Sequence, residues 1–232
     1  LLSFALIPIL LTKRKAPKFK KLGYIDVRGL YKTSPLATFS MFCTGLIHSA
    51  LFSLGAVYAA TMNFTLFEIS LMLFLITISG GIFQWPIGYY SDKTDRRIII
   101  ILSSFAAGLF SFLAIMASGT SLENMYLATS VGVDKFMFFV FVALYAGMSL
   151  PMFTLNLAYV NDYISKEKFV AAGAGMQIIF GIGAMIGPLL CSFLMNKYGP
   201  NGFFVHLMIF HLIIGMFGLY RMTKRRYEDN PE

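Results

Sequence analysis

Apolar residues form seven long runs along this chain, separated by short polar segments. The runs cover residues 1–12, 34–62, 66–90, 98–118, 136–160, 169–195 and 203–220. The last six are long enough to cross the hydrocarbon core of a bilayer, which takes about 20 helical residues. Transmembrane strands would need about ten residues of alternating polarity each, and these runs are longer and continuously apolar. The pattern therefore predicts an all-α integral membrane protein, a bundle of six transmembrane helices preceded by the end of another helix.

The composition supports a membrane protein. The chain is 57% hydrophobic and 13% charged, with a mean hydropathy of +0.72. A soluble domain carries roughly 25% charged residues, so this chain has too little polar surface to cover a water-soluble globule. Its two cysteines, Cys43 and Cys191, lie inside apolar runs, and we interpret them as packing residues rather than a disulfide framework.

Lys and Arg residues are concentrated in alternate polar segments. Segments 13–33, 91–97, 161–168 and 221–232 hold 17 of the 19, and the segments between them hold two. Because cytoplasmic loops are enriched in Lys and Arg, this asymmetry predicts a multi-pass protein of the cell membrane with both ends of the six-helix unit in the cytoplasm. It also explains the net charge of +8 without a nucleic-acid partner, since the chain has no soluble module with a basic patch.

The run 1–12 is followed by a basic triplet at 13–15. A secretory signal has the reverse order, so we interpret this run as the end of a truncated transmembrane helix. Residues 13–33 are basic and interrupted by Pro and Gly, which predicts a cytoplasmic linker. The six-helix bundle is then expected over 34–220, and a cytoplasmic tail over 221–232.

A densely charged turn separates the runs 66–90 and 98–118. It reads Gly88-Tyr-Tyr-Ser-Asp92-Lys93-Thr-Asp95-Arg96-Arg97. This turn resembles the loop signature Gly-x-x-x-Asp-Arg/Lys-x-Gly-Arg-Arg of the major facilitator superfamily. It departs from the signature at Asp95, where the family usually has Gly.

The resemblance covers essentially the whole chain and implies a solute transporter of twelve helices in two halves. The chain would be the carboxy-terminal half, so its implied partners are the lipid bilayer, a small-molecule substrate and an amino-terminal six-helix half. Transport would be secondary active or facilitative, by alternating access about a site between the halves. No cofactor is implied. The segments Gln84–Gly88 and Gly181–Leu190 are also similar to a branch of poorly characterised bacterial permeases.

The resemblance also suggests a gate. In the family, the positions that match Asp92, Arg96 and Asp162 form a conformational latch at the cytoplasmic face. Two carboxylates around one guanidinium can form charge-assisted pairs, and the charged turn and the end of run 136–160 share that face. The alternative is that these are solvated charges that only fix the orientation of the protein, worth about 0–1 kcal/mol each.

Candidate cavity residues follow helical spacing. One polar stripe on the run 136–160 comprises Tyr145, Ser149, Met152, Asn156 and Tyr159, and Pro151 interrupts the same helix. A polar stripe in lipid must face either a wet cavity or a partner helix, so substrate binding and inter-helix hydrogen bonding are both open. The resemblance implies that this helix and the run 34–62 line the substrate cavity.

Thr44 and His48 lie one turn apart in the run 34–62, in the middle of the membrane. A mid-membrane ionisable group is a functional candidate, for cavity lining or proton coupling, although a neutral hydrogen-bonding role is the common alternative. Gln84 and Gln177 are weaker cavity candidates. Gly183, Gly187 and Pro188 lie on the presumed eleventh helix, and we interpret them as residues for close helix packing and bending.

Other chemistry finds no support in the sequence. It has no Gly-x-x-x-x-Gly-Lys-Ser/Thr nucleotide loop, no metal-ligand spacing and no convincing catalytic set at one membrane depth. We therefore do not expect an enzyme. The alternatives are a non-transporting membrane protein, as a scaffold or intramembrane enzyme, and a half-size transporter that dimerises. The truncated first helix disfavours the half-size transporter.

Overall fold

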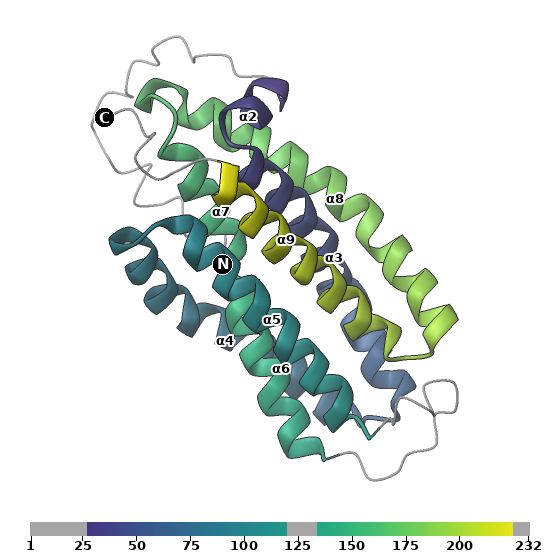
Figure 1. Cartoon of the computed structure of the whole chain (residues 1–232). Coiled ribbons are helices and arrows are strands. Elements are labelled where there is room, and N and C mark those ends of the chain that lie inside the picture. The colour runs from purple at the N-terminus through teal and green to yellow at the C-terminus, as the bar shows by residue number, and fades with distance from the viewer. Residues whose placement is uncertain (1–26, 120–133, 225–232) are drawn as a thin grey trace, which may run out of the picture.

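The described part of the chain is built from helices. The computed structural model describes residues 27–119 and 134–224. Its elements, shown in Figure 1, are α2 (Val27–Thr33), α3 (Pro35–Thr61), α4 (Leu66–Lys93), α5 (Arg96–Ala117), α6 (Lys135–Ser149), α7 (Met152–Asn161), the short η3 (Lys166–Lys168), α8 (Phe169–Tyr198) and α9 (Gly202–Lys224). The helix fragment expected at 1–12, and parts of the expected linker and tail, lie outside the described residues.

Six membrane-length spans are present in the described ranges, which confirms the predicted bundle. Four of them are single helices, the span Lys166–Tyr198 consists of η3 and α8, and the span Lys135–Asn161 consists of α6 and α7. Pro151 accounts for this break, because proline has no N–H to donate and its ring clashes with the preceding turn. The expected linker 13–33 is not wholly irregular, since α2 occupies its last seven residues.

Side-chain caps fix where three of the helices begin. Thr65 and Glu68 form a capping box at the start of α4. Asp95 caps α5 by accepting a hydrogen bond from the Arg97 amide, and Asp134 caps α6 by accepting one from the Met137 amide. Each cap satisfies an amide that has no partner within its own helix. The α4–α5 connection can therefore be as short as two residues.

Glycines bring α3 and α8 into backbone contact. A Cβ added at Gly183 would lie 2.2 Å from the Phe42 carbonyl oxygen, and one added at Gly45 would lie 2.2 Å from that of Phe180. At Gly187 it would lie 2.3 Å from the Leu46 oxygen. Only glycine allows so close an approach, and small residues serve this purpose between membrane helices. The α3–α8 pair is thus tightly packed.

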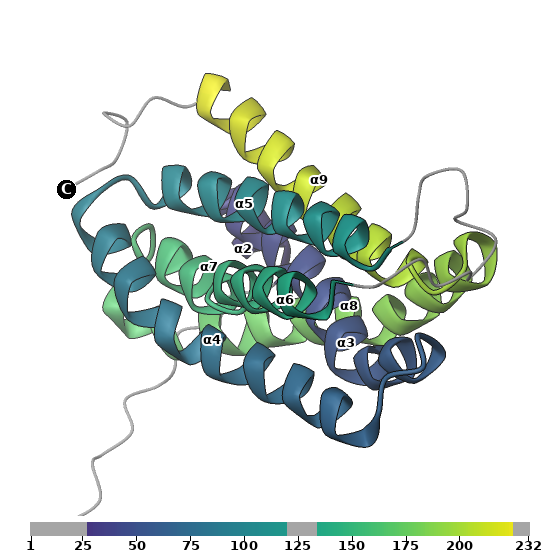
Figure 2. The same ribbon diagram turned by 90° about the horizontal axis from the view of Figure 1, so that it is seen from below.

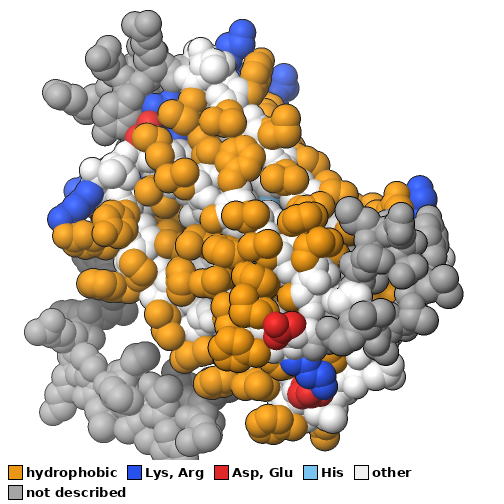
Figure 3. Space-filling model, turned by 60° about the horizontal axis from the view of Figure 1, so that its bottom comes forward, with side chains coloured by type: hydrophobic (Ala, Val, Ile, Leu, Met, Phe, Trp, Pro, Cys, Tyr) orange, Lys and Arg blue, Asp and Glu red, His pale blue; other side chains and the backbone are white. Residues whose placement is uncertain are grey.

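The remaining helices surround this pair unequally. α5 and α9 pack against each other on one side of the bundle, and α4 lies on the other side (Figure 2). Only 22% of the most apolar stretch of α4 and of α8 is buried, against 50% in α5 and in α9. Figure 3 shows a broad apolar face with charged side chains towards its margins. α4 and α8 therefore present the largest uncovered surfaces of the described bundle.

Ion pairs join α4 to the α6–α7 span near both ends. At one end, Lys135 Nζ lies 2.6 Å from Glu68 Oε1. At the other end, Arg96 joins Asp92, in the last turn of α4, to Asp162, which directly follows α7. The second of these ends carries most of the charged turn singled out in the sequence.

Candidate functional site

The charged turn forms a cluster around one guanidinium. Arg96 Nη2 lies 2.8 Å from Asp92 Oδ1, and Arg96 Nε lies 2.8 Å from Asp162 Oδ2. Arg96 Nη1 also donates to the Ser91 hydroxyl at 3.0 Å. We call Asp92, Arg96 and Asp162 the Arg96 cluster. It brings together the three residues that the sequence predicts as a latch.

Local structure explains how these residues meet. Asp92 and Arg96 are four positions apart, across a connection of two residues, Thr94 and Asp95. Asp162 caps the carboxy-terminal end of α7, where its amide donates to the Ala158 carbonyl. One arginine side chain therefore links α4, α5 and α7. An arginine can do this because its planar fork offers several donors in fixed directions.

The three members of the cluster differ in exposure. The Arg96 side chain is 19% exposed, Asp162 is 42% exposed and Asp92 is 68% exposed. Burial raises the pKa of Asp162 above its ordinary value, Arg96 opposes this effect, and the nearby Asp92 and Asp95 carboxylates add to it. The Asp162 carboxyl group is thus less readily ionised than that of an ordinary aspartate.

A second ion pair lies beside the cluster. Arg97 Nη2 is 2.7 Å from Asp95 Oδ2, and both side chains are largely buried. Tyr163 donates a hydrogen bond to the Tyr159 hydroxyl at 3.3 Å on the adjoining end of α7. Lys93 is exposed and donates a hydrogen bond to the Tyr89 hydroxyl.

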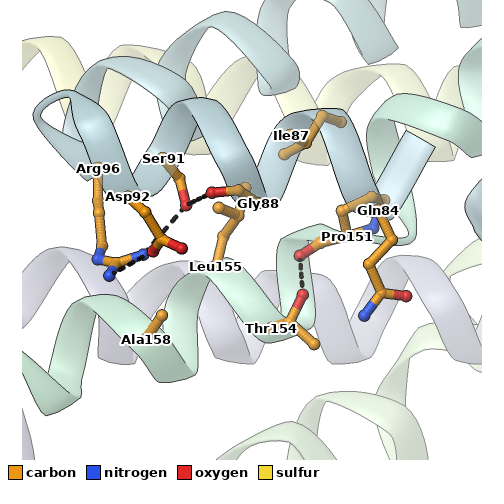
Figure 4. A pocket seen from close by; sticks show the side chains of 10 residues that line it. All are labelled: Gln84, Ile87, Gly88, Ser91, Asp92, Arg96, Pro151, Thr154, Leu155 and Ala158. Atoms are coloured by element: carbon orange, nitrogen blue, oxygen red, sulfur yellow. Dashed lines mark hydrogen bonds and ion pairs between the residues drawn. The ribbon is translucent and has the colours of Figure 1, made fainter.

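A cleft runs from the Arg96 cluster along the groove between α4 and α7. Its volume is about 230 Å³, and it is lined by Gln84, Ile87, Gly88, Ser91, Asp92, Arg96, Pro151, Thr154, Leu155 and Ala158. Figure 4 shows Arg96 at one end of the cleft and Gln84 at the other. Gly88 borders open space, because no atom beyond its own stretch of helix lies within 4 Å of where its Cβ would be.

A smaller polar cavity adjoins the cluster. Its volume is about 210 Å³, and it is lined by Ser91, Asp92, Thr94, Asp95, Arg96, Tyr159, Asp162 and Tyr163. Tyr159, predicted as a cavity residue, is therefore beside the ion pairs rather than with the rest of its stripe. This second cavity gathers charged groups, and the first is mainly apolar with polar groups at its ends.

The rest of the predicted stripe lies inside the bundle. Tyr145, Ser149 and Asn156 are fully buried, as is Thr44. Asn156 Nδ2 donates to Thr44 Oγ1 at 3.2 Å, Ser149 donates to the Tyr145 hydroxyl at 3.3 Å, and His48 Nε2 donates to the Ser149 carbonyl at 3.1 Å. Two of these bonds, Asn156 to Thr44 and His48 to Ser149, join the α6–α7 span to α3.

Gln84 on α4 and Gln177 on α8 are not buried inside the bundle. Both side chains are exposed on the described bundle. An amide side chain at membrane depth is costly against lipid, so such a position indicates a wet cavity or a protein partner. These two weaker candidates of the sequence are exposed, whereas Tyr145, Ser149 and Asn156 are buried.

The sequence reasoning did not select Ser91 and Thr154, which contribute hydroxyl groups to the cleft. Isolated Ser and Thr residues are common in membrane helices, where they bond carbonyls of their own helix, as Ser91 does at Gly88 and Thr154 at Pro151. The only sequence signal for Ser91 as a site residue is its position directly before Asp92 in the charged turn. Within the described ranges, no group of three or more His, Cys, Asp or Glu residues could hold a metal ion.

Comparison with known proteins adds independent information. Residues 1–149 and 39–232 each match the family model described as Major Facilitator Superfamily. The chain is 25% identical to the uncharacterized MFS-type transporter YE1530 of Yersinia enterocolitica over an alignment of 189 residues. This alignment covers 82% of the chain and 43% of that protein. It is 22% identical over 188 residues to the uncharacterized MFS-type transporter YcaD of Escherichia fergusonii, with 81% and 44% covered.

A third relative comes from a different bacterial group. The uncharacterized MFS-type transporter YfkF of Bacillus subtilis is 25% identical over 166 residues, which is 71% of the chain and 38% of that protein. The chain thus spans less than half the length of these curated relatives. No solved structure matches it.

Proposed function

We propose that this chain, which belongs to the major facilitator superfamily, forms the carboxy-terminal half of a permease that moves a small solute across the membrane by alternating access. The observation that carries this proposal is the pair of sparsely covered helices, α4 and α8, each with an exposed glutamine at membrane depth. The family match points to a transporter rather than an enzyme.

The proposed partner is an amino-terminal six-helix half that covers α4 and α8. No atom beyond the glycine's own stretch of helix lies within 4 Å of a Cβ built at Gly81 on α4 or at Gly181 on α8, so both glycines leave room for a close helix contact. Gln84 and Gln177 would face the aqueous space between the halves. The length of the relatives, more than twice the matched region, agrees with a second half.

The proposed orientation puts the Arg96 cluster at the cytoplasmic face. The segments at this end of the bundle carry the excess of Lys and Arg residues, which favours the cytoplasm. The solute would then pass from a mid-membrane site near Gln84 towards the cluster, along the cleft between α4 and α7. We assign no solute, because half of the proposed site lies outside this chain.

The Arg96 cluster would act as the cytoplasmic latch. While Arg96 bonds Asp92 and Asp162, the end of α7 is held to the α4–α5 turn. Breaking the bond to Asp162 would release α7, which lines the cleft. Charge-assisted hydrogen bonds of this kind contribute about 1.5–3 kcal/mol each, enough to shift a two-state equilibrium about tenfold or more.

The accessibility of the two glutamines tests this proposal. In the full-length protein, Cys43, Cys191 and any other cysteine would be replaced by alanine, and a single cysteine would then replace Gln84 or Gln177. Membranes that contain each variant would be treated with a water-soluble thiol reagent. Both positions should react, because they face water. A cysteine at Leu109, exposed on α5, is the matched control and should not react, because it faces lipid. Failure of both glutamine positions to react would contradict the proposal.

A further inference from the structure

Asp95 and Arg97 form the most deeply buried ion pair among the described residues. Their side chains are 14% and 5% exposed. Arg97 Nη2 lies 2.7 Å from Asp95 Oδ2, and Arg97 Nε donates to both carboxylate oxygens at 3.0 and 2.9 Å. The carboxylate of Asp95 is therefore held closely by one guanidinium.

The same carboxylate fixes the backbone. Asp95 Oδ1 accepts a hydrogen bond from the Arg97 amide at 2.9 Å, which caps the first turn of α5. A negative charge at this position also interacts favourably with the helix dipole. Asp95 thus restrains both the start of α5 and the side chain of Arg97, which immediately follows Arg96.

Arg97 lies beside two tyrosines that share a cavity with Asp162, a partner of Arg96. The Tyr159 and Tyr163 hydroxyls are electrostatic neighbours of the Arg97 guanidinium, and both tyrosines line the same cavity as Asp95 and Asp162. Two adjacent arginines and three aspartates therefore meet at the end of α7. Their pairing is specific, since Arg97 bonds Asp95 while Arg96 bonds Asp92 and Asp162.

We propose that Asp95 is a positioning residue for the Arg96 cluster: it occupies Arg97, so that Arg96 alone bonds Asp92 and Asp162. Without the Asp95 carboxylate, the Arg97 guanidinium competes with Arg96 for Asp162 and shifts the end of α7 relative to the α4–α5 turn. A role of this pairing in gating rests on the proposed transport function. The pairing of Arg97 with Asp95, and of Arg96 with Asp92 and Asp162, does not depend on that function.

A simple capping role makes a different prediction. Asparagine caps helices about as well as aspartate does, so Asp95→Asn keeps the cap and removes only the charge. If Asp95 were only a cap, this change would be silent. If Asp95 occupies Arg97, the change releases a buried guanidinium, and Arg97→Gln in the same chain should restore the original arrangement.

The test is a distance measurement that needs no substrate. Spin labels are placed on cysteines at Thr94 and Ser165, both exposed, in the full-length protein after its other cysteines, Cys43 and Cys191 included, are replaced by alanine, and the protein is reconstituted in lipid. Asp95→Asn should shift or broaden the label-to-label distance distribution beyond the spread among replicate preparations. Asp95→Asn with Arg97→Gln should return the original distribution.

Asp134→Asn is the matched control. Asp134 caps α6 through the Met137 amide and makes no ion pair with another described residue. Its substitution should leave the distribution unchanged. If Asp95→Asn alone is not recovered from membranes, the double variant should still be recovered with the original distances.

Two results would overturn the proposal. One is an unchanged distribution in Asp95→Asn. The other is failure of Arg97→Gln to restore the distribution, or the recovery, of the Asp95→Asn protein. Neither result depends on transport. If the protein moves no solute, but Asp95→Asn changes the distance distribution and Arg97→Gln restores it, the proposed function is refuted and the role of Asp95 is supported.

Discussion

Arg96 Nε lies 2.8 Å from Asp162 Oδ2, although the two residues are 66 positions apart in the chain. The bond joins the first residue of α5 to the residue that follows α7. Because the same guanidinium bonds Asp92, the end of the cleft is held by three helices at once.

Arg96→Lys should slow transport in the full-length protein. An ammonium group cannot reproduce a planar fork that bonds two carboxylates and the Ser91 hydroxyl together. Asp92→Asn, which keeps the shape and removes the charge, should also slow the conformational cycle. We expect roughly tenfold slower initial uptake with little change in equilibrium solute binding, because the cluster lies far from the membrane centre.

The measurement is initial uptake and binding of the transported solute at matched expression. If the charges only fix orientation, Arg96→Lys should have no effect, since Lys and Arg count alike in the positive-inside bias. Uptake near the wild-type rate in both variants would leave orientation as the only role of these residues.

Asp162 should make stability depend on pH in a defined direction. Its folded-state pKa is raised, mainly by burial, so the folded protein binds a proton more readily than the unfolded chain does. Its contribution to stability is therefore greatest below the ordinary pKa of aspartate, about 3.9, and falls as pH rises through the raised folded value.

The measurement is the unfolding temperature of the wild type minus that of Asp162→Asn across this pH range. The difference should fall as pH increases. A difference that rises with pH would mean that Arg96 outweighs burial at this carboxylate.

Gly183→Ala should destabilise the bundle by about 1–3 kcal/mol, as is typical of overpacked sites. The added methyl group would lie 2.2 Å from the Phe42 carbonyl oxygen and force α3 and α8 apart. Gly181→Ala, two residues earlier on the same helix, has open space and should not destabilise the 232-residue chain. Equal unfolding temperatures for the two variants would contradict the close α3–α8 contact.

The charge asymmetry predicts which segments are cytoplasmic. Single cysteines at Thr94 and Ser121, in the cysteine-free background, should behave differently towards an impermeant thiol reagent added to intact cells. Ser121 belongs to a segment poor in Lys and Arg and should be labelled, whereas Thr94 should not. Labelling of Thr94 but not of Ser121 would reverse the proposed orientation.

Hydropathy was sufficient to predict the six spans, because each run is long and continuously apolar. The short charged turn and the family resemblance also led to the prediction that Asp92 and Arg96 pair. Spacing placed Tyr145, Ser149 and Asn156 on one helix face, but it could not tell whether that face points into the bundle or towards a cavity. That direction depends on which helices pack against α6 and α7, and this is a property of the tertiary structure.

The Asp95–Arg97 pair could not be predicted either. From the sequence, either arginine could bond any of the three nearby aspartates, and only the short turn and the cap at Asp95 select the pairing. The cleft between α4 and α7 depends on a contact between segments more than 60 positions apart. The exposure of Gln84 and Gln177 likewise follows from which helices are left uncovered.

The most direct test of the central claim measures access to Gln84 from the two sides of the membrane. A cysteine at this position in the otherwise cysteine-free, full-length protein would be treated with an impermeant thiol reagent, in right-side-out and in inverted vesicles. Alternating access predicts reaction from both sides, with Arg96→Ala increasing the cytoplasmic rate relative to the outer rate. Reaction from one side only, or from neither, with no response to Arg96→Ala, would contradict it.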